Sequence, residues 1–468
     1  MRTSGVRYLI FSILVAVVAA LAFAGGPAVT VSVDELVEGI SCAADPSQTY
    51  TLYLPPGYTT ERSWPVLLIF DPRGRSALAA EIFREAAHDY GWVLVSSNDT
   101  RSDGTWEPNI KAVNALWPEV HERIAGDPER IYATGLSGGA TVAHALSQQS
   151  GQIAGVIACG GPFIAELVEG SRTPVFITAG NLDFNYQQLG ELDALLAAQH
   201  TPHRTVVFEG THQWMPPSVA RQAIEWFEVL AMKDGLRERD SELLETVFSN
   251  EVALAEELSE AGHELEAAQQ LDATARTFDG LLDIAHVRAR AAELEASPEA
   301  RRQRKEEKRW KAFEKRSTER LASQIAVLKS ADLPPPPEQV ARELHLEELL
   351  RRATTDGAEG EAAQRVLNSY SSQLGFYLTR QFLQNRQWDR AAVSLELALA
   401  INDNNPIAWY NLACCRALLR RQAAAVEALE RAVECGFDNA ELLASDPDLD
   451  SLRDRVDFKA LLDTVESK

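Results

Sequence analysis

A serine in this chain stands in a setting suited to nucleophilic attack. Ser137 is the centre of Gly135-Leu136-Ser137-Gly138-Gly139, a G-x-S-x-G motif between a β-branched run and a helical stretch. Such a motif places the serine on a strained turn that exposes its hydroxyl, and the outer glycines remove side chains that would collide. We therefore interpret it as a nucleophile elbow; the alternative is a glycine-rich turn with an incidental serine.

An acid and a base follow in the order that a catalytic triad requires. Asp183 comes after the expected strand 174–178, and His212 comes after the last expected strand, 205–208. The chain order Ser, Asp, His is one of the orders in which triads are built. The alternatives are a helix-capping aspartate and an ordinary surface histidine. The remaining histidines in this part of the chain are placed in or beside expected helices: His88, His121, His144, His200 and His203.

These three residues predict acyl transfer. His212 would take the proton of Ser137 during attack on an acyl carbonyl, while Asp183 fixes the imidazole tautomer. The resulting oxyanion needs two donors, one of them the N–H of Gly138 directly after the nucleophile.

The second oxyanion donor is expected after strand 66–70. There the chain reads Asp71-Pro72-Arg73-Gly74-Arg75, and Pro72 has no N–H to donate. Arg73 is the predicted donor, with Gly74 as the alternative.

Large apolar residues flank the predicted site. Trp106, Trp214 and Met215 are candidates for an acyl or aromatic pocket, although plain core packing is the commoner role for such side chains. Only a short stretch separates Cys159 from the strand at Pro174, which leaves little room for a helical lid.

The elements that would position these residues alternate between strands and helices from residue 50 to residue 227, which is typical of a mostly parallel sheet covered on both faces. The expected strands are 50–54, 66–70, 92–97, 130–134, 153–159, 174–178 and 205–208. The expected helices are 77–90, 113–125, 139–150, 187–200 and 218–232.

After Met232 the strand signals end and the chain predicts an all-α region. A 34-residue period, typical of tetratricopeptide (TPR) repeats, relates five positions in each of two copies. The copies are Leu378, Thr379, Ala391, Leu395, Ala398 and Leu412, Ala413, Ala425, Leu429, Ala432, with Trp409 as a further aromatic match. A weaker earlier copy is Leu254, Ala255, Ala267 and Leu271, with Thr274 at the fifth position.

The N-terminus predicts export. Arg2 and Arg7 precede an apolar run over 8–22, and Ala22-Phe23-Ala24 fits a signal-peptidase site. A periplasmic or secreted protein follows, with an uncleaved membrane anchor as the alternative. In an oxidising compartment Cys42 and Cys159 are a possible disulfide.

Charge limits the partners. The formal charge of −23 disfavours nucleic acid and anionic lipid surfaces. The basic stretch 301–320 is interpreted as a solvated helical face, with an anion-binding patch as the alternative.

Together these signals predict five segments. They are 1–24 signal peptide, 25–233 α/β domain that carries the predicted triad, 234–333 helical region, 334–370 proline-rich joint and helical linker, and 371–468 TPR repeats. The four prolines 334–337 would form a stiff spacer.

Residues 50–232 resemble the α/β-hydrolase superfamily, especially its carboxylesterase, dienelactone-hydrolase and polyhydroxybutyrate-depolymerase-like esterases. The resemblance implies hydrolysis of small-molecule or polymeric carboxylic esters without a metal or cofactor. It assigns catalysis to Ser137, Asp183 and His212 and one oxyanion contact to Gly138. Asp71-Pro72 departs from the His-Gly pair common in these esterases.

Two other functions stay open. The hydrolase-like part could be a weak or inactive envelope scaffold, with a protein or peptide partner bound to the TPR region. A serine peptidase would use the same fold and triad.

Overall fold

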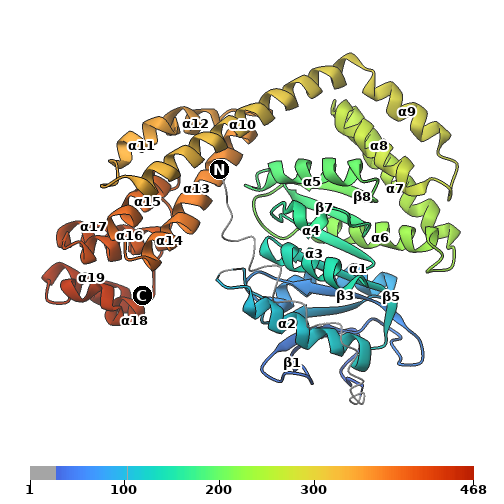
Figure 1. Cartoon of the computed structure of the whole chain (residues 1–468), viewed down its shortest axis with the longest axis horizontal. Helices are drawn as coiled ribbons and strands as arrows, with labels where there is room; N and C mark the ends of the chain where they lie inside the picture. Colours follow the sequence, from blue (N-terminus) through green and yellow to red (C-terminus); the bar gives the residue numbers. More distant parts are fainter. Residues whose placement is uncertain (1–27, 103, 468) are drawn as a thin grey trace. The chain divides into compact units, whose positions relative to one another are not determined.

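The computed structural model describes residues 28–102 and 104–467, which fall into two compact units, Met1–Arg304 and Lys305–Lys468 (Figure 1). The predicted signal peptide, 1–24, lies outside the described residues. Within the described ranges, none of the helices has both the length and the apolar character needed to span a membrane.

The first unit is built on one eight-stranded sheet with the order β1-β2-β4-β3-β5-β6-β7-β8. The strands are β1 Leu36–Ser41, β2 Thr49–Tyr53, β3 Trp64–Phe70, β4 Val93–Ser97, β5 Gly126–Leu136, β6 Gly155–Cys159, β7 Val175–Gly180 and β8 His203–Phe208. Strand β2 pairs antiparallel with β1 and β4, and all other pairs are parallel. The mostly parallel sheet is confirmed, and β1 is an additional edge strand.

Continuous burial of the central strands follows from helices on both faces. In β3, Val66 and Leu68 contribute to the core beneath α2 (Glu107–Pro118), α3 (Gly138–Ser150) and α5 (Tyr186–Ala198). The alternate residues Leu67 and Ile69 contribute to the core beneath α1 (Ser76–Tyr90) and α6 (Pro217–Lys233). These two cores hold the sheet between its helical layers (Figure 1).

The parallel strands bring four chain segments to one edge of the sheet. Their carboxyl ends lead directly into Asp71 after β3, Ser137 after β5, Asp183 beyond β7 and His212 beyond β8. Ligands bind at this edge in open α/β sheets.

Helices after the sheet belong to the same unit. The helices are α7 Ser241–Glu260, α8 Glu264–Phe278 and α9 Ala285–Glu295. Val229 and Met232 of α6 share a core with Leu244 of α7, and the buried Arg204 of β8 pairs with Glu251 of α7. The predicted boundary at 233–234 therefore does not separate two units. The strand-type sequence pattern ends there together with the sheet, but the helices that follow still pack against the sheet domain.

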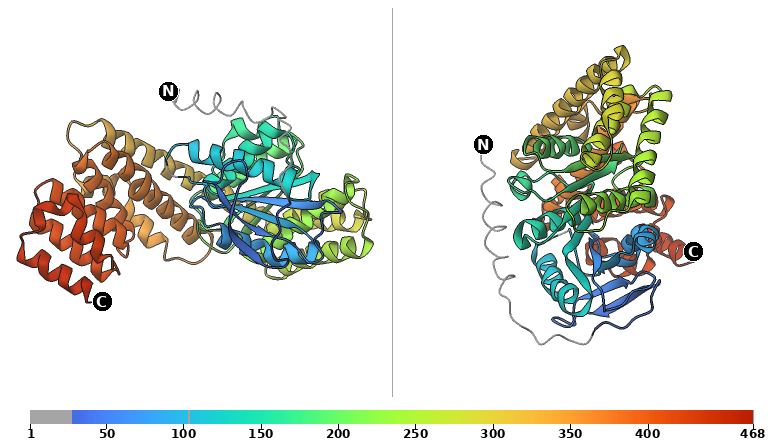
Figure 2. Two further views of the ribbon diagram at one scale, coloured as in Figure 1. Left: turned by 90° about the horizontal axis from the view of Figure 1, so that it is seen from below. Right: turned by 90° about the vertical axis from the view of Figure 1, so that its right-hand side faces the viewer.

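The second unit is helical. Its elements are the C-terminal part of α10 (Pro298–Ser330), α11 Pro337–Glu343, α12 Leu346–Arg352, α13 Ala358–Ser372, η2 Gln373–Leu378, α14 Thr379–Gln384, α15 Trp388–Ile401, α16 Pro406–Leu418, α17 Gln422–Glu434, α18 Ala440–Ser445, η3 Pro447–Leu452 and α19 Val456–Glu466. Neighbouring helices of this unit lie alongside one another (Figure 2).

The segment predicted as a joint and linker, 334–370, is part of this unit's core. Val340 and Leu344 of α11 and Leu349 of α12 are buried in it. The proline run lies between helices as predicted, because α10 ends at Ser330 and residues 334–336 are not helical. Pro337 is the first residue of α11, a position where the missing proline N–H costs no helical hydrogen bond. The predicted boundary at 371 also falls within continuous helical structure.

The repeat positions are the buried positions of paired helices. In the two C-terminal copies, all ten matched residues are at most 5% exposed, and they lie on η2, α14 and α15 and on α16 and α17. In the earlier copy Leu254 is 37% exposed while the other four positions are buried. Small alanines at these positions allow the helices to approach closely.

The five cysteines are free thiols in the structure. Cys42 lies in the core on one face of the sheet and Cys159 in the core on the other, so the possible disulfide between them is not formed. Burial raises the pKa of Cys42 to about 12.

Protonation of His144 should couple stability to pH. This α3 residue is buried, and burial lowers its pKa from 6.5 to about 4. In the unfolded chain the His144 imidazole binds a proton below about pH 6.5, whereas in the folded chain it does so only near pH 4. The free energy of unfolding therefore decreases as the pH is lowered from about 6.5 to about 4, and His144 contributes up to about 3 kcal/mol to this decrease. Denaturant unfolding at several pH values should show a smaller decrease in the free energy of unfolding for His144→Leu than for the wild type.

His263→Leu is the matched control, because His263 is exposed at the start of α8. An identical pH dependence for His144→Leu and wild type would contradict this account of His144.

Candidate active site

Ser137 occupies a strained backbone position between β5 and α3. Its φ is 54° and its ψ is −121°, a conformation that non-glycine residues seldom adopt. A Cβ on Gly135 would lie 2.1 Å from the Gly139 carbonyl carbon, and a Cβ on Gly139 would lie 1.8 Å from the Phe70 carbonyl oxygen. Both outer motif glycines are thus required by close backbone approach.

Asp183 and His212 form a pair. Nδ1 of His212 lies 2.9 Å from both Oδ1 and Oδ2 of Asp183. Asp183 is fully buried, and its Oδ1 also accepts the Asn185 N–H at 2.7 Å. The carboxylate therefore fixes the imidazole through Nδ1 and leaves Nε2 as the nitrogen for proton exchange.

The end of β6 and the residue after it contact Ser137 and this pair in turn. The Ser137 N–H donates to the Cys159 carbonyl oxygen at 2.8 Å. At the next residue, a Cβ on Gly160 would lie 2.7 Å from Asp183 Oδ2 and 3.3 Å from His212 Nδ1. Among the hydrogen bonds of the described residues, none joins Ser137 to His212; such bonds often tighten only when substrate is bound.

The sequence analysis missed two residues that contact the parts of this site. The Phe184 ring packs on the His212 ring with centroids 4.0 Å apart. The Asn185 side chain donates to the Gly160 carbonyl oxygen at 2.9 Å. Phe184 and Asn185 are the two residues after Asp183, and this position was the sequence signal from which they could have been predicted.

Asp71 organises the loop after β3. Its carboxylate accepts the Arg73 N–H at 2.8 Å, the Arg75 N–H at 3.1 Å, the Arg75 guanidinium and the Trp214 indole N–H at 2.8 Å. Burial alone would raise the pKa of this carboxyl, but the bonds from Arg75, Trp214 and the backbone lower it below its usual value. Asp71 is thus a buried, ionised anchor for the loop.

The predicted oxyanion donor Arg73 is contradicted by these bonds. Its N–H is already paired with Asp71 Oδ1, and the alternative, Gly74, donates its N–H to the Asp71 carbonyl oxygen at 3.1 Å. Gly138, in contrast, is the first residue of α3, where an N–H has no intrahelical acceptor.

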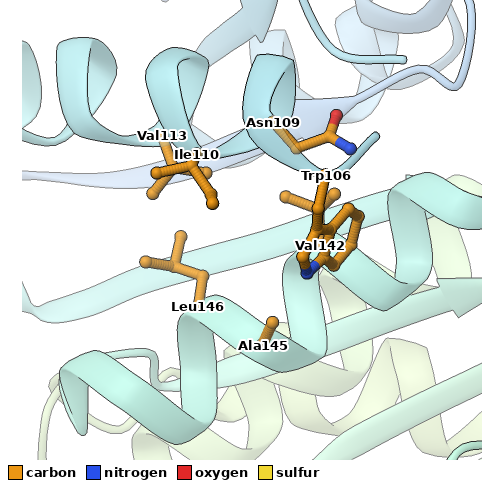
Figure 3. Close-up of a pocket in the computed structure, with 7 residues that line it drawn as sticks. All are labelled: Trp106, Asn109, Ile110, Val113, Val142, Ala145 and Leu146. Carbon is orange, nitrogen blue, oxygen red and sulfur yellow. The ribbon is translucent and has the colours of Figure 1, made fainter. Parts of the chain in front are cut away.

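The predicted pocket residues separate into two groups. Trp214 and Met215 are buried in the core under α1 and α6, where Trp214 packs edge-on against Phe83, which is the core-packing alternative for these side chains. Trp106 is half-buried and lines a small apolar recess between α2 and α3 (Figure 3). The other residues of this recess are Asn109, Ile110, Val113, Val142, Ala145 and Leu146.

A set of metal-type ligands occurs in the second unit. Ligand atoms of Cys414, Asp446 and Asp448 lie within 4.8 Å of one another. Burial raises the pKa of the Cys414 thiol, which opposes the thiolate that a metal requires. In the described residues, no comparable set includes Asp183 or His212.

Comparison with known proteins gives partial similarities. No family model matches the chain. An 85-residue stretch is 35% identical to a chloroplastic protein of Arabidopsis thaliana. The stretch is 18% of this chain and 25% of that protein, so the chain spans about a quarter of that protein's length.

Three solved structures illustrate the structural similarity. A ferulic acid esterase matches with a TM-score of 0.34 and 16% identity, over 41% of this chain and 96% of its own. The S-formylglutathione hydrolase FrmB of Staphylococcus aureus matches with a TM-score of 0.35 and 13% identity. The match covers 43% of this chain and 99% of that protein's chain. A thermostable esterase matches with a TM-score of 0.35 and 16% identity. The match covers 42% of this chain and 63% of that protein's chain. Similarity at this level assigns no family.

Replacing Gly160 should disable the site. Its φ is +51° and an added Cβ would strike Asp183 Oδ2. We expect Gly160→Ala to displace the Asp183–His212 pair and to lower any ester hydrolysis by about 100-fold. Steady-state kinetics on the purified variant measures this.

Gly170→Ala is the matched control, because Gly170 has a φ of +78° and no atom within 4 Å of an added Cβ. Both variants should lose about 1–2 kcal/mol of stability from backbone strain, but only Gly160→Ala should lose activity. Equal activity losses would contradict the role of Gly160.

Proposed function

We propose that the chain is an exported serine hydrolase that cleaves carboxylic esters through an acyl-enzyme. One observation supports this most strongly: the strained Ser137 turn and the pair of His212 with the buried Asp183 pack against the same short segment, Cys159–Gly160. Export rests on the N-terminal sequence pattern alone.

The first step is attack by Ser137. Its oxygen bonds to the ester carbonyl carbon, the proton moves to Nε2 of His212, and the carbonyl electron pair becomes an oxyanion beside the Gly138 N–H. Asp183 stabilises the imidazolium through Nδ1. Collapse of this intermediate expels the alcohol, which takes the proton from His212.

The second step releases the acid. His212 takes a proton from water, the hydroxide oxygen bonds to the acyl carbon, and collapse restores the Ser137 hydroxyl. Every step uses side chains and backbone groups of the first unit, so the proposal calls for no metal or cofactor.

The connection after β6 supports an accessible substrate. Between β6 and β7 the chain forms only the four-residue α4, Ala165–Val168, which leaves no helical lid. We infer small-molecule or accessible polymeric esters as substrates, with Trp106 beside the apolar recess as a contact for the acyl part.

One observation favours the alternative of an inactive hydrolase-like scaffold. The N–H groups of Arg73 and Gly74 are turned onto Asp71, so the loop after β3 offers neither to an oxyanion. No feature of the described residues specifically favours a peptidase.

Loss of the nucleophile tests the proposal. We expect Ser137→Ala to lower the hydrolysis of short-chain p-nitrophenyl esters by at least about 10⁴-fold, because the acyl-enzyme cannot form. Initial rates of purified wild type and variant measure it.

Ser150→Ala serves as the control, since Ser150 lies at the far end of α3 and its hydroxyl donates to the Leu146 carbonyl oxygen. A folded wild type without esterase activity towards a broad ester panel would favour the scaffold.

We propose, second, that the C-terminal helices are TPR repeats that bind a protein or peptide. The 34-residue period coincides with buried positions of paired helices, as stacked repeats require. Phe376 on η2 is 42% exposed and packs edge-on against Tyr377, which gives an aromatic surface suited to a partner.

A photo-crosslinking amino acid at position 376 of the full chain tests this partner surface. We expect ultraviolet light to join the chain to a second protein in the native cell envelope. The same amino acid in place of Val456, which is 84% exposed on α19, should give no such product. Equal products from both positions, or none from position 376, would contradict the proposal.

A further inference from the structure

The nucleophile elbow has a polar side-chain neighbour from the loop after β4. A Cβ on Gly138 would lie 2.4 Å from Ser102 Cβ and 3.6 Å from Ser102 Oγ. The Ser102 side chain therefore lies directly against the residue that supplies the first oxyanion contact. We propose that the Ser102 hydroxyl is the second hydrogen-bond donor to the oxyanion, an inference that rests on the proposed esterase function.

The need for such a donor comes from the β3 loop. A tetrahedral oxyanion is stabilised by two or more fixed donors. The two backbone groups expected to help Gly138, those of Arg73 and Gly74, are bonded to Asp71. Ser102 places a hydroxyl next to Gly138 without requiring this loop to break its bonds to a buried carboxylate.

The loop that carries Ser102 is fixed at three points. Thr100 Oγ1 donates to the Asp71 carbonyl oxygen at 2.8 Å, and the Ser102 N–H donates to the Pro72 carbonyl oxygen at 2.9 Å. The buried side chain of Asn109 accepts the Arg101 N–H at 2.9 Å and donates to the Arg101 carbonyl oxygen at 2.7 Å. A donor held in this way costs little reorganisation during the reaction, which is the condition for effective electrostatic stabilisation.

The Ser102 hydroxyl is available for this role. The Ser102 hydroxyl donates a long hydrogen bond, 3.5 Å, to the Pro72 carbonyl oxygen. Because a bond of this length is weak, the hydroxyl loses little binding energy when it rotates toward an oxyanion. When Ser137 attacks, the carbonyl electron pair moves to oxygen and Ser102 shares its proton in a hydrogen bond without transferring it. The Ser137 proton still passes to His212, so the charge balance of the reaction is unchanged.

Substitution of Ser102 separates this role from a structural one. We expect Ser102→Ala to lower kcat for p-nitrophenyl esters by about 100-fold with KM nearly unchanged, because the lost bond exists only in the transition state. Ser102→Thr, which keeps the hydroxyl, should retain most of the activity. Binding of a phenylboronic acid, whose tetrahedral adduct imitates the intermediate, should weaken in parallel with kcat/KM for Ser102→Ala.

The outcomes distinguish this inference from the proposed function. Ser102→Ala with wild-type kcat and wild-type boronic acid affinity would overturn the role of Ser102 and leave Ser137 as the nucleophile. A wild type that neither hydrolyses esters nor binds the boronic acid would overturn both. Ser150→Ala again controls for the loss of a serine, and thermal unfolding of Ser102→Ala should match the wild type because the side chain is exposed.

Discussion

Close backbone approach at the carboxyl end of β5 is the constraint on which the site depends. The chain must turn from strand to helix within one residue, and Ser137 takes up the strain with a φ of 54°. Phe70 of the neighbouring strand approaches so closely that only glycine fits at position 139. Because the sheet and α3 bury both sides of this turn, their packing stabilises a conformation that an isolated peptide would avoid.

The buried Asp71 carboxylate holds the loops around this turn in place. Asp71 binds the turn after β3, and through Trp214 it also binds the chain just beyond His212. The Asp71 carbonyl oxygen accepts from Thr100 in the loop after β4. Segments distant in sequence thus share one anchor, and Asp71 also accepts the backbone N–H groups of Arg73 and Gly74. The proposed ester hydrolysis therefore needs a second donor from elsewhere, and this is the role that we propose for the Ser102 hydroxyl close to Gly138.

Sequence reasoning found what local pattern encodes. The buried β-branched runs predicted seven of the eight strands in the described part of the chain, and the motif around Ser137 predicted the strained turn. Strand β1 escaped because it is a half-exposed edge strand with Gly39 inside it. The order of Asp183 and His212 along the chain was readable, and their pairing at 2.9 Å agrees with it.

Other features depend on tertiary packing. The burial of Trp214 and Met215 is set by α1 and α6, which no local pattern around them reveals. The bond from the Arg73 N–H to Asp71 was foreseeable in part, since an aspartate often accepts the N–H two residues on. The unit boundary was misplaced because helices α7 to α9 continue the packing of α6, although their composition differs from that of the sheet region.

Covalent trapping by an organophosphate shows directly whether Ser137 is a nucleophile. Purified full-length protein would be treated with diisopropyl fluorophosphate and mapped by peptide mass spectrometry. We predict one phosphorylated residue, Ser137, and a much slower reaction when His212 is replaced by alanine. A modified residue other than Ser137, or a folded protein that takes up no phosphoryl group, would contradict it.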